Sequence, residues 1–123
     1  MTIVDILTAI QKNANLNKKE ISKYLCVKEK DINNWKKKQT VPSKYQVQNI
    51  LHLATLFDID ISQFNWIRYI ESVLEIVYND EYRICDGIDE NKYLVHLCRI
   101  DGVQGYVPIE DISNRKKDLF KNI

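Results

Sequence analysis

The chain has 123 residues, of which 45% are hydrophobic and 28% are charged, and this balance is typical of an ordinary globular protein. No apolar run approaches the ~20 residues that a transmembrane helix needs, so we expect no membrane segment. The first ten residues lack the basic start and the cleavage site of a secretory signal, and the three cysteines are irregularly spaced. These features predict a cytoplasmic protein with free thiols.

Charge is distributed unevenly along the chain, although the net charge is only +1. Residues 1–64 carry ten lysines against six acidic residues, a net charge of +4, whereas residues 65–123 have a net charge of −3. The positive charge is concentrated in residues 17–45, which hold nine lysines and three acidic residues. Such a basic region is typical of a nucleic-acid-binding surface. A solvated surface from a genome biased to lysine, asparagine and isoleucine has the same composition, so charge alone does not decide.

Two helices are predicted at the start of the chain, each with a recognisable cap. A helix over residues 2–14 is capped by Thr2, with Asp5 three residues on as its partner in a capping box. Asn17 and Glu20 form the same kind of pair ahead of the second helix, which ends at the letters "CV". Both helices are short, so most of their stability must come from packing.

Two further helices are predicted in the first half of the chain. One runs from about Glu29 to Lys37. The other runs from Ser43 to Phe57, after a loop in which Pro42 disfavours helical backbone in its predecessor. The segment "DIDISQF" then forms a turn or a short fifth helix. The apolar side chains expected to face the core of the four helices are Ile3, Ile6, Leu7, Ile10, Ile21, Tyr24, Leu25, Ile32, Trp35, Val47, Ile50, Leu51, Ala54 and Leu56.

The second half of the chain predicts a helix followed by a small sheet. Residues 65–79 are amphipathic. After them, the segments "YRICD", "KYLVHLCRI" and "VQGYVPI" are rich in strand-forming residues. Asp101-Gly102, between the last two segments, is a strong signal for a hairpin turn. Residues 110–123 are expected to form a short helix or a frayed tail.

The two short helices on either side of "CVK" have the design of a helix-turn-helix. In such a unit the first helix braces the second, which lies in the major groove with its N-terminal residues at base edges. The groove is ~12 Å wide and admits one α-helix. The predicted fold class is therefore α+β. An N-terminal all-α helix-turn-helix domain of four or five helices occupies residues 1–64, and a helix and a small antiparallel three-stranded β-sheet occupy residues 65–123.

A set of residues at fixed spacing supports this interpretation: Ile21, Ser22, Val27, Ile32, Trp35, Pro42, Leu53, Ala54, Leu56 and Ile59. They match the pattern Ser/Thr-Gln-x-x-Leu-Ala, Gly-Val-Ser, Ile-x-x-Trp-Glu-x-Gly, Pro, and a helix ending Leu-Ala-x-x-Leu-x-Val. Residues 3–64 thus resemble the Cro/phage-repressor type of helix-turn-helix, also called the xenobiotic-response-element family. The resemblance implies double-stranded DNA as a partner.

The chain departs from the family pattern at four positions. Cys26 stands where the family prefers glycine in the turn, so we expect a left-handed conformation there at a cost of ~1 kcal/mol. Lys18 replaces the usual glutamine, and Lys36 and Lys38 replace the usual acid and glycine after the tryptophan. The lysine replacements raise the positive charge where the family contacts the DNA backbone.

Carried over by position, the resemblance implies two sets of DNA-contacting residues. The base-reading set is Lys28, Glu29, Lys30 and Asn34, with Asn33 at its edge. Lysine can donate to guanine, asparagine can pair with adenine and glutamate can accept from cytosine. The phosphate-binding set is Lys18, Lys36, Lys37, Lys38 and Lys44, with backbone amides at the start of the fourth helix.

These observations predict a sequence-specific transcription regulator, a repressor of phage, mobile-element or bacterial origin, that binds an inverted-repeat operator as a homodimer. The dimer or partner interface is expected on an apolar stripe of Trp66, Ile70, Val73, Leu74 and Val77. Two alternatives stay open. One is a phage anti-CRISPR protein with a helix-turn-helix domain that binds and inhibits a Cas nuclease, with or without repression of its own promoter. The other is the antitoxin of a toxin–antitoxin pair.

No catalytic or cofactor motif stands out, so we expect neither enzyme activity nor a bound cofactor. His96 and Cys98 share a face of one predicted strand, and Cys85 is a third candidate ligand. A zinc site needs a fourth ligand and better spacing, so we expect no metal and interpret these residues as buried cysteine and half-exposed histidine. The "DGVQGYVP" segment faintly resembles bacterial SH3-like strands, over a short stretch only.

Overall fold

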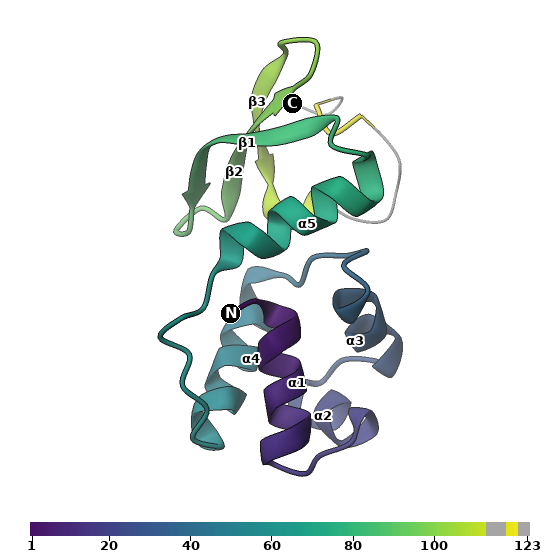
Figure 1. Cartoon of the computed structure of the whole chain (residues 1–123), viewed down its shortest axis with the longest axis vertical. Helices are drawn as coiled ribbons and strands as arrows, with labels where there is room; N and C mark the ends of the chain where they lie inside the picture. The colour runs from purple at the N-terminus through teal and green to yellow at the C-terminus, as the bar shows by residue number, and fades with distance from the viewer. Residues whose placement is uncertain (113–117, 121–123) are drawn as a thin grey trace. The chain divides into compact units, whose positions relative to one another are not determined.

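The computed structural model describes residues 1–112 and 118–120. These residues form five α-helices followed by a three-stranded antiparallel sheet, which confirms the predicted α+β class. The elements, shown in Figure 1, are α1 (Ile3–Asn13), α2 (Lys18–Leu25), α3 (Glu29–Lys36), α4 (Lys44–Leu56), α5 (Trp66–Tyr78), β1 (Tyr82–Asp89), β2 (Leu94–Arg99), β3 (Gln104–Pro108) and a 3₁₀ turn, η1 (Ile109–Asp111).

The chain folds into two compact units. The first comprises Met1–Lys37 and Pro42–Trp66, and the second comprises Lys38–Val41 together with Ile67–Ile123. The segment 38–41, which comes directly after α3 and its cap, therefore belongs to the second unit. The sequence division between residues 64 and 65 placed this segment with the first.

Reciprocal side-chain bonds begin the helices, as the sequence predicted. The Thr2 backbone amide donates to Asp5 Oδ2 at 2.8 Å, and the Asp5 amide donates back to the Thr2 hydroxyl. Asn17 Oδ1 accepts from the Glu20 amide at 2.8 Å, while Glu20 Oε1 accepts from the Asn17 amide at 3.1 Å. These bonds satisfy amides that have no partner inside the helix, so they fix where α1 and α2 begin.

The core of the first unit contains most of the predicted apolar side chains. Those that are buried are Ile3, Ile6, Leu7, Ile10, Ile21, Leu25, Ile32, Trp35, Val47, Ile50 and Ala54, and Leu53, which was not predicted for the core, is buried with them. Three predictions were wrong, because Leu51 is only half-buried, Tyr24 is 59% exposed and Leu56 is 62% exposed. The buried face of α2 is centred on Ile21, Ser22 and Leu25, which leaves Tyr24 at its margin, where its ring meets Phe57 edge-on.

The second unit pairs its strands in the order β1-β2-β3. The pairing of β1 with β2 is interrupted by a bulge between Ile84 and Ile88, whereas β2 and β3 pair without a break. The predicted Asp101-Gly102 turn joins β2 and β3, with Gly102 at a φ of 92°. Its amide donates to the Arg99 carbonyl at 2.9 Å. Glycine adopts this conformation without strain, so the turn follows directly from the sequence.

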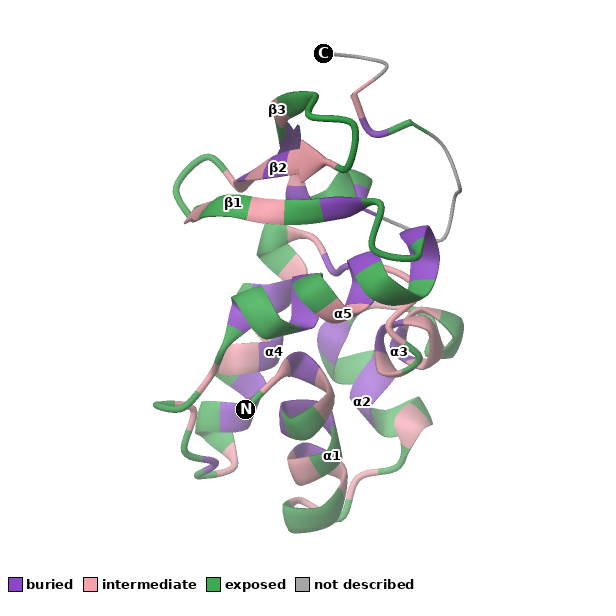
Figure 2. Ribbon diagram, turned by 45° about the horizontal axis from the view of Figure 1, so that its top comes forward, coloured by how far each residue is buried: buried purple, intermediate pink, exposed green. Residues whose placement is uncertain are grey.

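The helix α5 lies along one face of the sheet, and the residues between them form the core of the second unit (Figures 1 and 2). The fully buried side chains of this core include Tyr69, Ile70, Val73, Val95, Leu97, Val107, Ile109 and Ile112. The prediction for residues 110–123 is only partly addressed. One 3₁₀ turn covers Ile109–Asp111, and residues 113–117 and 121–123 lie outside the described part of the chain.

The apolar stripe of α5 requires a correction. Trp66, Ile70, Val73, Leu74 and Val77 are each at most 8% exposed. An amphipathic helix buries its apolar face wherever its own chain supplies a covering surface, and here the stripe is buried in the folded chain. These five residues therefore do not form an open interface for a second copy or another partner.

Candidate nucleic-acid interface

The turn between α2 and α3 begins with a left-handed residue. Cys26 has φ 55° and ψ 42°, as its place in the turn predicted. The next amide, of Val27, donates to the Ser22 carbonyl at 3.0 Å and closes the end of α2. Lys28 then starts α3, with its backbone amide donating to Asp31 Oδ2 at 3.1 Å. Only Cys26 and Val27 therefore separate the last residue of α2 from the cap of α3.

The helix α3 has one buried side and one polar side. Ile32 is fully buried and Trp35 is 3% exposed. At 100° per residue, the opposite side of the helix carries a polar face made of Glu29, Lys30, Asn33, Asn34 and Lys37. The charged members of this polar face are exposed and the two asparagines are half-buried. The structure thus brings four of the five predicted base-reading residues onto one side of α3, with Lys28 at its cap.

The ammonium group of Lys36 lies on the flank of α3 and donates to the amide oxygen Oε1 of Gln11 in α1. Partial burial and the nearby charge of Lys18 lower the pKa of Lys36. Within the described part of the chain, neither lysine forms an ion pair with a carboxylate. Lys18 and Lys36 therefore form a lysine pair whose two positive charges repel each other, and an anion beside them would relieve that repulsion.

The other predicted phosphate-binding lysines are more dispersed. Lys37 caps the end of α3 and is exposed, whereas Lys38 is half-buried, left-handed at φ 58° and part of the second unit. Lys44 is exposed in the first turn of α4, just after the capping residue Ser43. The structure thus brings Lys18 and Lys36 together in the first unit, whereas Lys38 belongs to the second unit.

Sequence reasoning missed Gln11, which accepts the hydrogen bond from Lys36. Gln11 and Lys36 are 25 positions apart, and no local pattern relates them. The contact exists because α1 packs against α3 in the first unit, which brings the last turns of both helices within reach. Helical spacing alone can show only that Gln11 is off the buried face of α1.

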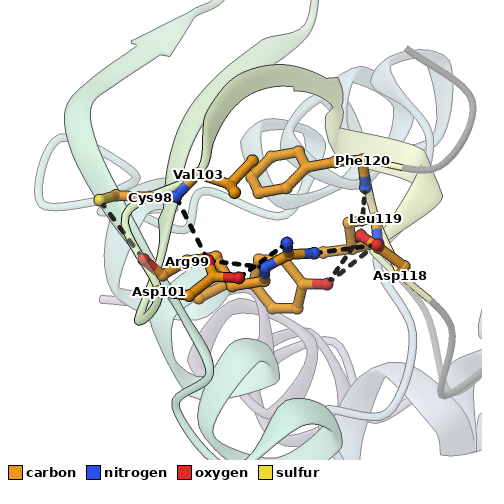
Figure 3. Close-up of polar contacts among 8 residues, drawn as sticks. Cys98, Arg99, Asp101, Val103, Asp118, Leu119 and Phe120 are labelled. Atoms are coloured by element: carbon orange, nitrogen blue, oxygen red, sulfur yellow. Dashed lines mark hydrogen bonds and ion pairs between the residues drawn. The ribbon is translucent and has the colours of Figure 1, made fainter.

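The second unit holds a cluster of charges that partner one another (Figure 3). Arg99 donates from Nε to Asp101 Oδ1 and from a terminal nitrogen to Asp118 Oδ2, both at 2.9 Å. The Arg99 side chain lowers the pKa of Asp101. Its guanidinium carbon lies 5.6 Å from the ring centre of Phe120. Because two carboxylates neutralise Arg99, this cation is already engaged within the chain.

The His96 and cysteine residues do not converge on a metal geometry. His96 Nδ1 lies 2.8 Å from Asp86 Oδ2, and the imidazole ring stacks on Tyr106 with ring centres 4.7 Å apart. Cys98 is half-buried and donates to the Arg99 carbonyl, while Cys85 is exposed. Among the residues that the structure describes, no group of three or more His, Cys, Asp or Glu side chains is arranged to hold a metal ion.

The chain matches no protein-family model, no curated protein and no solved structure. No helix in residues 1–112 and 118–120 has the length and apolar character that crossing a membrane requires.

Proposed function

We propose that the protein is a sequence-specific DNA-binding transcription regulator, a repressor that binds an inverted-repeat operator as a dimer. The observation that carries this proposal is the polar face of α3, which lies opposite the buried Ile32 and Trp35. In the proposal α2 and α3 act as a helix-turn-helix, with α2 as the bracing helix and α3 as the recognition helix. A helix of this kind presents its N-terminal side chains to base edges in the major groove.

The polar face offers both donors and acceptors for base edges. Lys30 and Lys28 can donate to guanine O6 and N7, and Glu29 can accept from the cytosine amino group. Asn34 can form two hydrogen bonds with adenine, and Asn33 lies beside it on the same face. This mixture suits reading a mixed sequence better than holding phosphates alone, for which lysine would be enough.

The lysine pair supports a phosphate contact beside α3. Lys18 and Lys36 repel each other in the free protein. A phosphate between them is attracted by both positive charges and relieves their mutual repulsion. Residues 17–45 carry nine lysines and three acidic residues, and each lysine that neutralises a phosphate releases a counterion. We therefore expect affinity to fall steeply with salt.

The proposed dimer cannot use the α5 stripe, because that stripe is buried in the chain itself. Large apolar side chains are exposed instead around the β2–β3 hairpin, where Ile100 is 74%, Val103 41% and Tyr106 56% exposed. Among the strands of the described residues, β3 is also an edge strand, a position that can pair with a strand of another chain. We propose this hairpin as the contact between two copies, with half-sites about one helical turn apart, ~34 Å.

A gel-shift series across the DNA upstream of the protein's own gene tests the proposal. One fragment with an inverted repeat should shift at lower protein concentration than a random duplex of equal length at moderate salt. Sedimentation should give two chains per operator. Equal affinity for every fragment and for random DNA would refute sequence-specific regulation.

A second candidate function is inhibition of a protein partner, either a Cas nuclease or a toxin. The exposed apolar hairpin in a half of the chain with a net charge of −3 favours it, since an acidic surface can imitate nucleic acid. Co-purification of the tagged full chain from a host lysate distinguishes the two. A stoichiometric nuclease or toxin, lost when Ile100 is changed to Asp, favours the inhibitor or antitoxin. Operator DNA as the specific ligand favours the regulator.

A further inference from the structure

The loop that follows α3 is held by a tyrosine of α5. Tyr69 donates its hydroxyl to the backbone carbonyl oxygen of Thr40 at 2.7 Å, and the two residues are 29 positions apart. The Tyr69 side chain is fully buried. Both residues belong to the second unit, although α3 itself belongs to the first.

The bond is partly buried. Val41, next to Thr40, is 8% exposed. Burial raises the pKa of Tyr69 well above its usual value, so the hydroxyl keeps its proton and remains a donor over the whole neutral range. Burial, and then electrostatic interaction with Glu110 and with Tyr69, raise the pKa of Tyr93, which places a second tyrosine near the first. A carbonyl oxygen in such surroundings is costly to leave without a donor.

Only a few bonds separate this contact from α3. Lys36 is the last residue of α3 and Lys37 is its cap, so Thr40 lies three residues beyond the cap. Lys38, between them, has a φ of 58°, a left-handed conformation that costs a residue with a Cβ about 1 kcal/mol. The bond from Tyr69 therefore restrains this loop at Thr40, and a shift of Thr40 can pass along the short backbone segment to the last turn of α3.

We propose that Tyr69 is a positioning residue for DNA recognition. Its hydroxyl fixes the loop after α3 and, through that loop, the orientation of the polar face of α3. The proposal rests on the proposed function and adds to it that α3 depends on the second unit. Lys37, at the end of α3, is the polar-face residue nearest to the loop and should be affected most.

The test uses the full chain and two matched variants. Tyr69→Phe removes the hydroxyl and keeps the ring. Tyr82→Phe removes another buried hydroxyl of the second unit, one that donates to Asp118 and accepts from the Leu119 amide, far along the chain from α3. Operator affinity is measured well below the melting temperature of both variants. Tyr69→Phe should weaken binding about tenfold, roughly the equivalent of one hydrogen bond, and Tyr82→Phe should bind as the wild type does.

Hydrogen exchange gives a readout that does not need DNA. In Tyr69→Phe, amides of residues 33–41 should exchange several-fold faster than in the wild type, while in Tyr82→Phe the increase should be confined to the neighbourhood of Leu119. If Tyr69→Phe does not fold, Thr40→Gly loosens the same loop with the tyrosine intact and should show the same two effects.

Two results would overturn the proposal. One is wild-type affinity and wild-type exchange in Tyr69→Phe. The other is an equal loss of DNA affinity in Tyr82→Phe, which would show general destabilisation instead of positioning. A wild-type chain that does not distinguish the operator from random DNA refutes the proposed function instead. In that case the exchange of residues 33–41 alone decides whether Tyr69 sets α3.

Discussion

A terminal guanidinium nitrogen of Arg99 lies 2.9 Å from Oδ2 of Asp118, and the two residues are 19 positions apart. The bond ties the end of β2 to a residue near the end of the chain. Asp118 also accepts from the Tyr82 hydroxyl and from the Phe120 amide, and the Tyr82 hydroxyl accepts from the Leu119 amide. Residues 118–120 are therefore anchored on the second unit by side chains from two strands.

Asp118→Asn should release residues 118–120, because an amide cannot form the ion pair with Arg99. The amides of Leu119 and Phe120 should exchange several-fold faster with solvent in the variant. The Phe120 amide, and then Arg99, lower the pKa of Asp118 in the folded chain. The ionised Asp118 carboxylate therefore stabilises the fold fully at pH values above ~4, the usual pKa of aspartate, and this stabilisation is lost as the pH falls through the lower pKa of the folded state. Acid should therefore mimic the variant. Glu75→Gln, an exposed change on α5, should leave both amides as in the wild type.

Cys26→Gly should stabilise the chain by up to ~1 kcal/mol, because glycine removes the left-handed penalty while adding some unfolded-state entropy. Urea denaturation measures the change. Cys26→Ala keeps a Cβ at a φ of 55° and should give no gain. Lys23→Gly, inside α2, should instead destabilise by ~1 kcal/mol. A loss of stability in Cys26→Gly would mean that the thiol contributes more than the strain costs.

Lys36→Met should weaken DNA binding without weakening the fold. Burial and Lys18 already disfavour the charged ammonium, so its removal should leave the melting temperature unchanged or slightly higher. Affinity should fall on all sequences alike, and the dependence of log affinity on log salt should lose about one unit of slope. Lys12→Met, at the exposed end of α1, should change neither quantity. A marked drop in melting temperature would show that the bond to Gln11 outweighs the repulsion.

Asn34→Ala and Lys37→Ala should separate base reading from phosphate contact. Loss of a bidentate asparagine contact costs ~1–3 kcal/mol on the operator and little on random DNA. Loss of a phosphate contact weakens both equally and lowers the salt slope by about one. Titrations on operator and random duplex at three salt concentrations measure all of these. Equal losses on random DNA for both variants would contradict the assignment of α3 as the recognition helix.

The features predicted correctly from the sequence are local ones. The pairs Thr2 with Asp5 and Asn17 with Glu20 act over three residues, and the Asp101-Gly102 turn is set by the glycine itself. Residue type at short spacing therefore determines them. The same spacing placed the polar face on one side of α3, since its period needs no knowledge of the rest of the chain.

The features that were missed depend on packing between distant segments. Periodicity identified the α5 stripe as apolar, but its burial depends on what covers it, which the pattern does not contain. Tyr24 was placed in the core because its spacing from Ile21 puts it at the margin of the apolar face of α2, where spacing alone does not distinguish a buried from an exposed side chain. The bonds from Lys36 to Gln11 and from Tyr69 to Thr40 span 25 and 29 positions. Nothing in either local segment marks these partners.

The passage of segment 38–41 into the second unit has a consequence for synthesis of the chain. A ribosome releases residues in order, so α1 to α4 can all have formed before Tyr69 leaves the exit tunnel. Until α5 emerges, the carbonyl of Thr40 lacks the hydroxyl that holds it. Under the role proposed for Tyr69, the orientation of α3 is completed late, by a residue that follows the whole first unit, and a nascent chain halted before α5 would carry every polar side chain of α3 without the bond from Tyr69 to Thr40.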